Sequence, residues 1–284
     1  KRLLGKALDN AISLGVVIIV LFLIVPIRTE LLDFLLIINI GLSIMILMIT
    51  MNISETLEFS IFPSLLLVTT LFRLGLNVSS TRAILSRGYA GEVIQNFGNL
   101  ITGGNIVVGV VIFLIIVLVQ FIVITKGAER VAEVAARFTL DAMPGKQMAI
   151  DADLSSGLID EQTARLRRGK IQKEADFYGA MDGATKIVKG DAVMSLLITL
   201  INFVGGVIIG MVMGGGDFST VLQKYSIVTI GDGLVSQLPA LMISTATGMI
   251  VTRSVSEGSL NKDVVAQFKA QPRAILTTGI ILIF

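Results

Sequence analysis

The sequence predicts an all-α fold, a polytopic transmembrane helical bundle with a helical cytoplasmic loop. Hydrophobic residues make up 54% of the 284 residues and charged residues only 15%, whereas an ordinary soluble domain carries about 25% charged residues. The apolar residues are also gathered into blocks whose lengths are close to the roughly 20 residues that cross a bilayer as a helix. One globular surface could not cover so much apolar side chain, so lipid must surround much of the chain.

Seven apolar segments are predicted to span the membrane, and the last of them is incomplete. They are residues 11–27, 31–51, 61–73, 106–125, 191–213, 227–251 and those from 274 onward. Four of these spans fall in residues 1–125 and three in residues 191–284, on either side of a polar loop at residues 126–190. The chain begins without Met and stops inside an apolar run, so we expect it to be part of a longer protein.

The distribution of Lys and Arg predicts the orientation in the membrane. Residues 126–190 contain eleven of them, residues 252–273 contain four and the N-terminus contains three, whereas residues 214–226 contain one. Positive residues collect on the cytoplasmic side of membrane proteins. We therefore expect a multi-pass protein of the bacterial inner membrane whose N-terminus and 126–190 loop are cytoplasmic.

Three arginines do not fit this pattern. Arg73, Arg82 and Arg87 follow the third apolar segment, on the nominally external side. An unpaired guanidinium group at membrane depth is costly, so either these side chains are buried against acidic partners, which we favour, or the third segment is re-entrant. The polar residues between Arg73 and Arg82 predict a buried polar seam, although the two arginines are spaced so that they would not share one face of a straight helix.

The polar loop is expected to form short helices rather than a compact domain. Residues 129–138 carry apolar side chains at helical spacing, and the Pro144-Gly145 step is expected to break that helix. Asp160 is expected to cap a second helix that has a basic polar face. With few large apolar side chains the loop has little core of its own, which predicts that it packs against neighbouring subunits.

Two acidic residues stand at the predicted ends of spans. Asp191 opens the fifth apolar segment, shortly after Lys186, and Asp232 lies near the start of the sixth. A low-dielectric environment favours the neutral form of a carboxylic acid, so either residue could load and release protons. The alternative is that each is an ordinary helix N-cap at the level of the headgroups. Asp33, beside the start of the second segment, is expected to be interfacial.

Three glycines repeat at every fourth position of the fifth segment. Gly206, Gly210 and Gly214 form a small-xxx-small ridge, which allows two helices to approach closely in lipid. The alternative is the general abundance of Gly in membrane helices. The sequence does not say whether the partner helix belongs to the same chain.

No catalytic site, metal site or cofactor is predicted. The chain contains neither Cys nor His, so disulfides and the usual zinc ligands are excluded. The Gly145-Lys146 step lacks the earlier Gly and the following Ser or Thr of a phosphate loop, and the segment from Asp151 lacks the Gly and Glu of a calcium loop. The net charge of +2 is too small to suggest nucleic-acid binding. We expect no enzymatic activity.

The segment from Arg130 through Arg137, Asp141 and Pro144 to Asp153 resembles, over its whole length, the signature of the FHIPEP family of flagellar and virulence type III export-gate proteins. The tract from 73 to 82 and the stretch 231–241 also resemble this family, so the resemblance covers essentially the whole chain. By motif match, the family's functional positions fall on Arg73, Arg82, Arg130, Arg137, Asp141, Lys186, Asp191 and Asp232.

This resemblance implies a specific architecture and function. Family members have eight spans and a large cytoplasmic domain, of which the eighth span and the domain are absent from this sequence. The resemblance implies a homo-nonameric ring that couples the proton motive force to export of unfolded proteins, with a proton-coupling role for Asp191. It also implies contacts with other export-gate membrane proteins and, through the absent domain, with export substrates, chaperones and the export ATPase complex.

The sequence has three alternative interpretations. A virulence-injectisome homologue shares the loop signature, although the strict form of that signature favours the flagellar branch. A proton-coupled transporter of a small solute should show internal repeats and broken helices, and no convincing repeat is present. A purely structural scaffold predicts that neutralising Asp191 leaves export intact.

Overall fold

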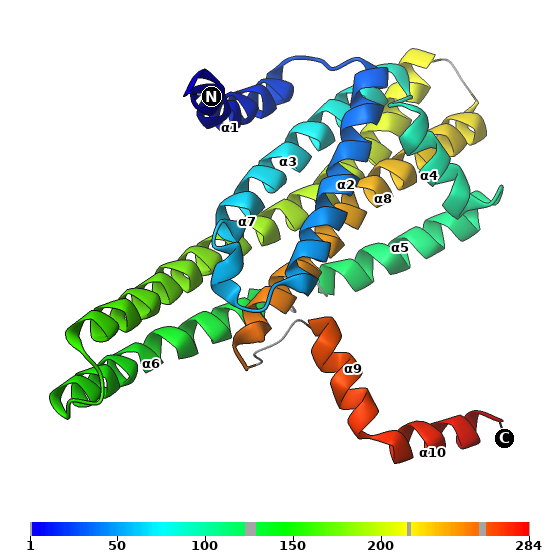
Figure 1. The fold of residues 1–284 in the computed structure, drawn as a ribbon. Helices are drawn as coiled ribbons and strands as arrows, with labels where there is room; N and C mark the ends of the chain where they lie inside the picture. The colour runs from blue at the N-terminus through cyan, green and yellow to red at the C-terminus, as the bar shows by residue number, and fades with distance from the viewer. Residues whose placement is uncertain (1, 123–128, 215–216, 256–259, 284) are drawn as a thin grey trace.

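The computed structural model describes residues 2–122, 129–214, 217–255 and 260–283 (Figure 1). This part of the chain is helical and contains no strand, which confirms the predicted all-α fold. Two short 3-10 turns, η1 (Thr56–Phe59) and η3 (Thr252–Val255), precede α3 and follow α8. The α-helices are α1 (Arg2–Ile24), α2 (Thr29–Asn52), α3 (Phe62–Arg87), α4 (Glu92–Thr102), α5 (Ile106–Ile122), α6 (Glu129–Ser155), α7 (Glu161–Gly214), α8 (Phe218–Val251), α9 (Leu260–Ala270) and α10 (Pro272–Ile283).

Several of these helices are suited to cross a bilayer. Within the described ranges, four stretches are long and apolar enough, namely 29–52, 56–87, 161–212 and 218–251. The pair α4 and α5 also qualifies as one broken span, bent by 102°. The apolar part of α1, Ser13–Ile24, is shorter. These lengths and compositions fit the predicted membrane helical bundle.

The third span does not end at Arg73, as the change in polarity had suggested. α3 continues without a break to Arg87 and ends at Gly88, which has a positive φ of 62° and donates its N–H to the carbonyl of Ile84 at 2.8 Å. The polar residues of its second half are buried among other helices, as Asn77 illustrates with 2% exposure. These polar residues face other helices rather than lipid. The prediction, which used polarity alone, therefore ended the third span too early.

Residues 129–190 form a hairpin, made of α6 and the first part of α7, rather than a set of short helices (Figure 1). α6 runs through Pro144, so the expected break there is wrong. The carbonyl of Leu140, which loses its helical partner to this proline, belongs to a residue with 40% exposure, where water can solvate it. α7 then passes through residue 190 into the apolar segment as one helix of 54 residues.

Asp160 caps α7, as predicted. Its Oδ1 accepts a hydrogen bond from the backbone N–H of Thr163 at 2.8 Å. The side chain and the backbone of Thr163 both donate to this carboxylate, and these bonds hold the pKa of Asp160 below its usual value. The cap fixes where the second arm of the hairpin begins.

α8 is the central helix of the bundle and packs against α2, α3, α4, α5, α6 and α7. Its closest crossing is with α4, where glycines of both helices meet. A Cβ added to Gly231 of α8 would collide with the backbone carbonyl oxygen of Ile94, and one added to Gly98 of α4 would collide with that of Ile227. No side chain fits between the two backbones at this crossing.

A carboxylate from α2 fixes the start of α4. Asp33 accepts hydrogen bonds from the backbone N–H groups of Glu92 at 2.8 Å and Val93 at 3.0 Å. The first N–H groups of a helix have no intrahelical partner, so a carboxylate placed there caps the helix and interacts favourably with its dipole. Asp33 therefore connects α2 to α4. The sequence analysis expected Asp33 to lie at the membrane interface and did not predict this capping role.

Candidate functional site

A buried ion pair joins α3 and α7. The Nε of Arg73 donates to Oδ2 of Asp191 at 2.6 Å, and Nη2 of the same guanidinium forms an ion pair with that oxygen. Arg73 is 2% exposed and Asp191 is 3% exposed. The expected burial of Arg73 against an acidic partner is therefore confirmed. Asp191 lies well inside α7 and is not the N-cap of a helix.

This pair is incompletely satisfied. Within the described part of the chain, Nη1 of Arg73 and Oδ1 of Asp191 are buried and have no hydrogen-bond partner. Buried polar atoms in proteins are nearly always paired, so each exception calls for an explanation such as a functional role or a bound water. Taking two charges out of water also costs several kcal/mol per ion. The pair is therefore costly in free energy and unusual for a contact whose only role would be to hold two helices together.

Asp232 occupies a second buried position, at the contact between α7 and α8. It is 3% exposed and accepts a hydrogen bond from Nδ2 of Asn202 at 2.9 Å. The hydroxyl of Ser80, on α3, lies near the same carboxyl group and donates to the backbone carbonyl of Asn77 at 3.0 Å. In the described ranges Asp232 forms no ion pair, so its only partners there are neutral. Asp232 also lies in the middle of α8, which rules out the helix-cap alternative for it.

A third contact links the same helices. Oγ of Ser236, on α8, donates to Oδ1 of Asn77, on α3, at 2.7 Å. Together these residues form one polar seam between three helices. It comprises Arg73, Asn77 and Ser80 of α3, Asp191 and Asn202 of α7, and Asp232 and Ser236 of α8.

Helical spacing explains why the polar seam forms. On α3 its residues stand at positions i, i+4 and i+7, and on α8 at i and i+4, which places each set on one face. On α7, Asp191 and Asn202 are eleven residues apart, about three turns, and therefore also share a face. The buried seam that the sequence predicted between residues 73 and 82 is present, and it extends over two further helices.

Further buried atoms of the seam have no partner within the described residues. They are Nδ2 of Asn77 and Oδ1 of Asn202. Donors and acceptors that are spaced along three helices are suited to hold water molecules or to relay protons between the two carboxyl groups. A cofactor or metal has no comparable support, because no cluster of three metal-ligating side chains occurs in the searched ranges.

Within the described residues, two of the three anomalous arginines have no acidic partner. Arg82 donates to the backbone carbonyls of Ile24 at 2.9 Å and Leu23 at 3.1 Å. It therefore binds the C-terminal end of α1, where a cation also complements the helix dipole. Arg87 is exposed at the end of α3. The expectation of burial against acids is wrong for both of these residues.

The other charged residues that the sequence singled out lie outside the polar seam. Arg130 and Arg137 are exposed on α6 and pair with Glu133, and Asp141 is exposed on the same helix. Lys186 is exposed on α7 and pairs with Asp182 at 2.7 Å. The structure therefore places these residues on the surface of the hairpin and of α7, and does not bring them to the buried carboxyl groups.

The glycine ridge packs inside the chain. A Cβ on Gly206 or Gly210 would collide with the ring of Tyr225, on α8, which is 6% exposed. The partner is therefore α8 of the same chain, and an aromatic ring rather than a second backbone occupies the groove. The surroundings of Gly214, the last residue of α7, lie outside the described part.

Sequence reasoning missed Asn202, Ser236 and the specific role of Ser80. Asn202 interrupts an otherwise apolar stretch eleven residues after Asp191, so its spacing could have predicted that it shares a face with that residue. The pairing of Asn202 with a residue of α8 has no local signal, because it depends on how two helices cross.

Comparison with known proteins places the chain in a family. Residues 19–284 match the FHIPEP family. The "Flagellar biosynthesis protein FlhA" of Bacillus subtilis is 57% identical over 94% of this chain and 39% of its own length. The protein of the same name from Salmonella typhimurium is 49% identical over 98% and 41%, and the "Low calcium response locus protein D" of Yersinia pestis is 51% identical over 99% and 40%.

The chain thus spans about two fifths of the length of the curated relatives that it matches. No solved structure matches it. Both the family match and these identities extend over most of the chain, including the hairpin and the three helices of the polar seam. The chain belongs to the FHIPEP family.

Proposed function

We propose that this chain is the membrane portion of an inner-membrane export-gate component of the flagellar type III export apparatus, which couples the proton motive force to the translocation of unfolded proteins. The names of the flagellar relatives support the export setting. The polar seam carries the proposal of coupling, because it places Asp191 and Asp232 in the interior of a helical bundle with polar side chains between them.

The proposed coupling acts on the contact between α3 and α7. As a carboxylate, Asp191 compensates the charge of Arg73; once protonated, it no longer does so. A proton that arrives along the seam would therefore weaken the attachment of α7 to α3, and its departure would restore it. Asp232, whose partners among the described residues are neutral, is the second proton-carrying position in this proposal. Lys186, which is exposed on α7 five residues before Asp191 and pairs with Asp182, is the third residue proposed to take part in proton coupling.

The experiment that tests this proposal neutralises Asp191 in the intact full-length protein. We expect Asp191→Asn to abolish export while the protein still assembles, and Asp191→Glu to retain part of the export because it keeps a titratable carboxyl group. Secretion of export substrates is measured for each variant, and assembly is checked alongside. Normal secretion by Asp191→Asn would contradict proton coupling through this residue.

A virulence export gate is the second candidate function. The Yersinia pestis relative, whose name is not flagellar, is 51% identical to this chain. This identity lies between the 49% and 57% of the two flagellar relatives quoted above, so sequence identity does not separate the two branches. Complementation distinguishes the two. A flagellar component restores motility to a strain that lacks its flagellar homologue, whereas a virulence component restores secretion in an injectisome mutant only.

The proposed topology predicts opposite labelling of the two ends of α7. A cysteine introduced at Gly157, in the tip of the hairpin, should react with a reagent only from the cytoplasmic side, and one at Asp217 only from the external side. Both residues are exposed, and the chain contains no native Cys. A cysteine at Ser259, which lies outside the described residues, is expected to behave like the one at Gly157. External labelling at Gly157 would contradict the topology.

We also propose a ring of identical subunits, nine by analogy with the family, in contact with other export-gate membrane proteins. Because α8 of the same chain occupies the ridge at Gly206 and Gly210, the ring contacts must use other surfaces, such as the exposed faces of α6 and α7. Native mass spectrometry of the full-length protein should detect this oligomer. A monomer under all conditions that preserve the fold would contradict it. Contacts with export substrates, chaperones and the export ATPase complex are proposed for the C-terminal part of the whole protein.

A further inference from the structure

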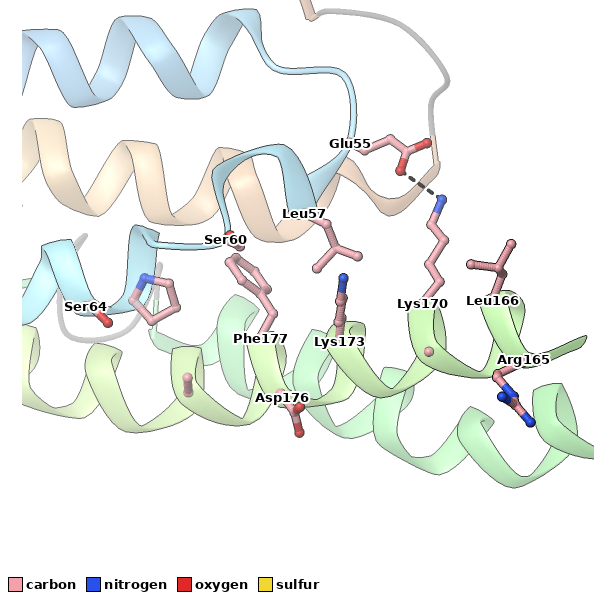
Figure 2. Close-up of a pocket in the computed structure, with 13 residues that line it drawn as sticks. Glu55, Leu57, Ser60, Ser64, Arg165, Leu166, Lys170, Lys173, Asp176 and Phe177 are labelled. Carbon is pink, nitrogen blue, oxygen red and sulfur yellow. Dashed lines mark hydrogen bonds and ion pairs between the residues drawn. The ribbon is translucent and has the colours of Figure 1, made fainter. Parts of the chain in front are cut away.

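A cavity of about 820 Å³ separates part of the first turn of α3 from the adjacent face of α7 (Figure 2). Pro63 and Ser64 of α3 line one side of this cavity, and Phe177 of α7 lines the other. The ion pair between Lys170 and Glu55 bridges it at 2.8 Å, but both side chains are more than half exposed, and such exposed pairs contribute little to stability. The side of α3 that carries Pro63 and Ser64 therefore contributes little to its attachment to α7.

Farther along its length, α3 packs against α1, which lies at the edge of the bundle (Figure 1). α1 has no comparable contact with any other described helix. Its outer face is exposed, as Val17, Leu21 and Ile24 illustrate with exposures of 55%, 47% and 71%. The attachment of α1 to the bundle therefore depends on what α3 offers it.

The C-terminal end of α1 leaves three backbone carbonyls without a helical donor. In a continuing helix the carbonyl of Phe22 would accept from the N–H of residue 26, but Pro26 has no N–H. The carbonyls of Leu23 and Ile24 belong to the last turn, where a helix has no further N–H groups to offer. Unpaired carbonyls are costly wherever lipid excludes water, so this end of α1 needs donors from elsewhere.

α3 supplies all three donors. Oγ of Ser79 donates to the carbonyl of Phe22 at 3.0 Å. Nη2 and Nη1 of Arg82 donate to the two carbonyls that follow, at 3.1 and 2.9 Å. The two helices also approach closely at Gly75, where an added Cβ would lie 3.2 Å from the carbonyl oxygen of Ile19. Arg82 thus provides two of the three hydrogen bonds that hold the end of α1.

The residues that bind α1 lie on the face of α3 opposite the polar seam. They stand at positions i, i+4 and i+7 of the helix and are Gly75, Ser79 and Arg82. The seam residues of α3 have the same spacing and are Arg73, Asn77 and Ser80. At 3.6 residues per turn, the two sets are separated by about half a turn. α3 is therefore held between α1 on one face and the seam on the other.

We infer that Arg82 is a positioning residue for the export gate. By binding the end of α1, it fixes this helix against α3, and α1 in turn holds the seam face of α3 toward α7 and α8. This role explains why Arg82 needs no acidic partner, because its ligands are backbone carbonyls. The inference rests on the proposed export function for its readout in cells, but not on proton coupling.

The test introduces Phe22→Cys and Gly75→Cys together in the full-length protein, and this chain contains no native Cys. A Cβ on Gly75 would lie 3.5 Å from Cβ of Phe22, which is within the range of about 3.5–4.5 Å found in disulfides. A membrane-permeant oxidant should therefore join α1 to α3. We expect Arg82→Gln to slow this reaction about tenfold in the purified protein, because hydrogen bonds from a charged donor are worth at least about this factor. Arg87→Gln is the matched control, since Arg87 is exposed at the end of the same helix.

Secretion in cells tests whether the contact matters for export. We expect Arg82→Gln to lose most of its secretion, and formation of the disulfide in the same variant to restore it until a reductant is added. The disulfide replaces the contact but not the positive charge. Recovery by the disulfide therefore distinguishes positioning of α1 from any direct use of the guanidinium group.

A second measurement leaves Gly75 intact, in case a side chain there disturbs the close approach to Ile19. A benzophenone side chain in place of Phe22 should cross-link to α3 on illumination, less in Arg82→Gln than in Arg87→Gln. Equal cross-linking in these two variants, normal secretion by Arg82→Gln, or no recovery by the disulfide would each overturn the inference. So would loss of secretion when the wild type is joined by the disulfide, which would show that α1 must leave α3. Cross-linking of the purified protein does not depend on Asp191, so this inference and the proposed coupling can fail separately.

Discussion

Replacing both members of the buried ion pair is expected to restore the stability that each single replacement removes, without restoring export. Arg73→Gln leaves the buried carboxylate of Asp191 without a compensating positive charge. Asp191→Asn leaves the buried guanidinium of Arg73 without a compensating negative charge. Breaking a buried pair by removing one partner costs about 3–5 kcal/mol, so each single variant should unfold at a clearly lower temperature. The double variant, Arg73→Gln with Asp191→Asn, contains two neutral amides that can hydrogen-bond, and it should recover most of this loss.

The double variant separates a structural role from a functional one. If Asp191 serves only to neutralise Arg73, the double variant exports substrates normally, and the proposed coupling is wrong. If the carboxyl group carries protons, the double variant is stable and inactive. Thermal unfolding of the full-length protein and secretion in cells measure the two properties separately. Arg167→Gln provides the control, because Arg167 pairs with Asp153 at 3.1 Å on the exposed surface of the hairpin, where such pairs contribute about 0–1 kcal/mol.

Gly231→Ala is expected to destabilise the bundle and to reduce export together. The new methyl group would press against the carbonyl oxygen of Ile94 on α4, which is backbone and cannot rotate away. Overpacking of this kind costs about 1–3 kcal/mol or more. Because Asp232 is the next residue along α8, any shift of the backbone also displaces this carboxyl group from Asn202.

Gly248→Ala supplies the comparison for this variant. Gly248 is on the same helix, and apart from the adjacent backbone of α8 itself nothing lies within 4 Å of the position of its added Cβ. Alanine there should be neutral or should stabilise the helix by up to about 1 kcal/mol, because Gly is the less favourable residue in a helix interior. Thermal unfolding and secretion should therefore separate the two variants. Equal behaviour would show that α4 and α8 can move apart without penalty.

The sequence predicts the helical class and one side of the polar seam, because both depend on local patterns. Long apolar segments identified the membrane helices, and the polar residues after Arg73 predicted a buried face of α3. The acidic partner expected for Arg73 is Asp191, although these residues are 118 positions apart. Asp191 and Asp232 could be singled out from the sequence because a carboxyl group within or beside an apolar segment is rare.

The remaining features depend on tertiary context. Pro144 is a strong local signal for a helix break, but it lies on an exposed helix whose freed carbonyl can be hydrated. The change from polar to apolar sequence at residue 191 suggested a boundary, yet helical hydrogen bonding continues across it. Asn202 acquires its role from how α7 crosses α8, and Ser236 acquires its role from how α8 crosses α3. Periodicity along a single helix contains no information about such crossings.

The unbroken course of α7 has a mechanical consequence. Asp191 lies thirty residues after Glu161, the first residue of this helix, so about 45 Å of rigid helix separates the ion pair from the hairpin tip. A tilt of about 5° at the ion pair would displace the tip by about 4 Å over this length. A small rotation at the ion pair can thus become a movement as large as an atom's diameter at the hairpin tip. α7 therefore has the geometry of a lever, with its shorter arm in the apolar residues after Asp191.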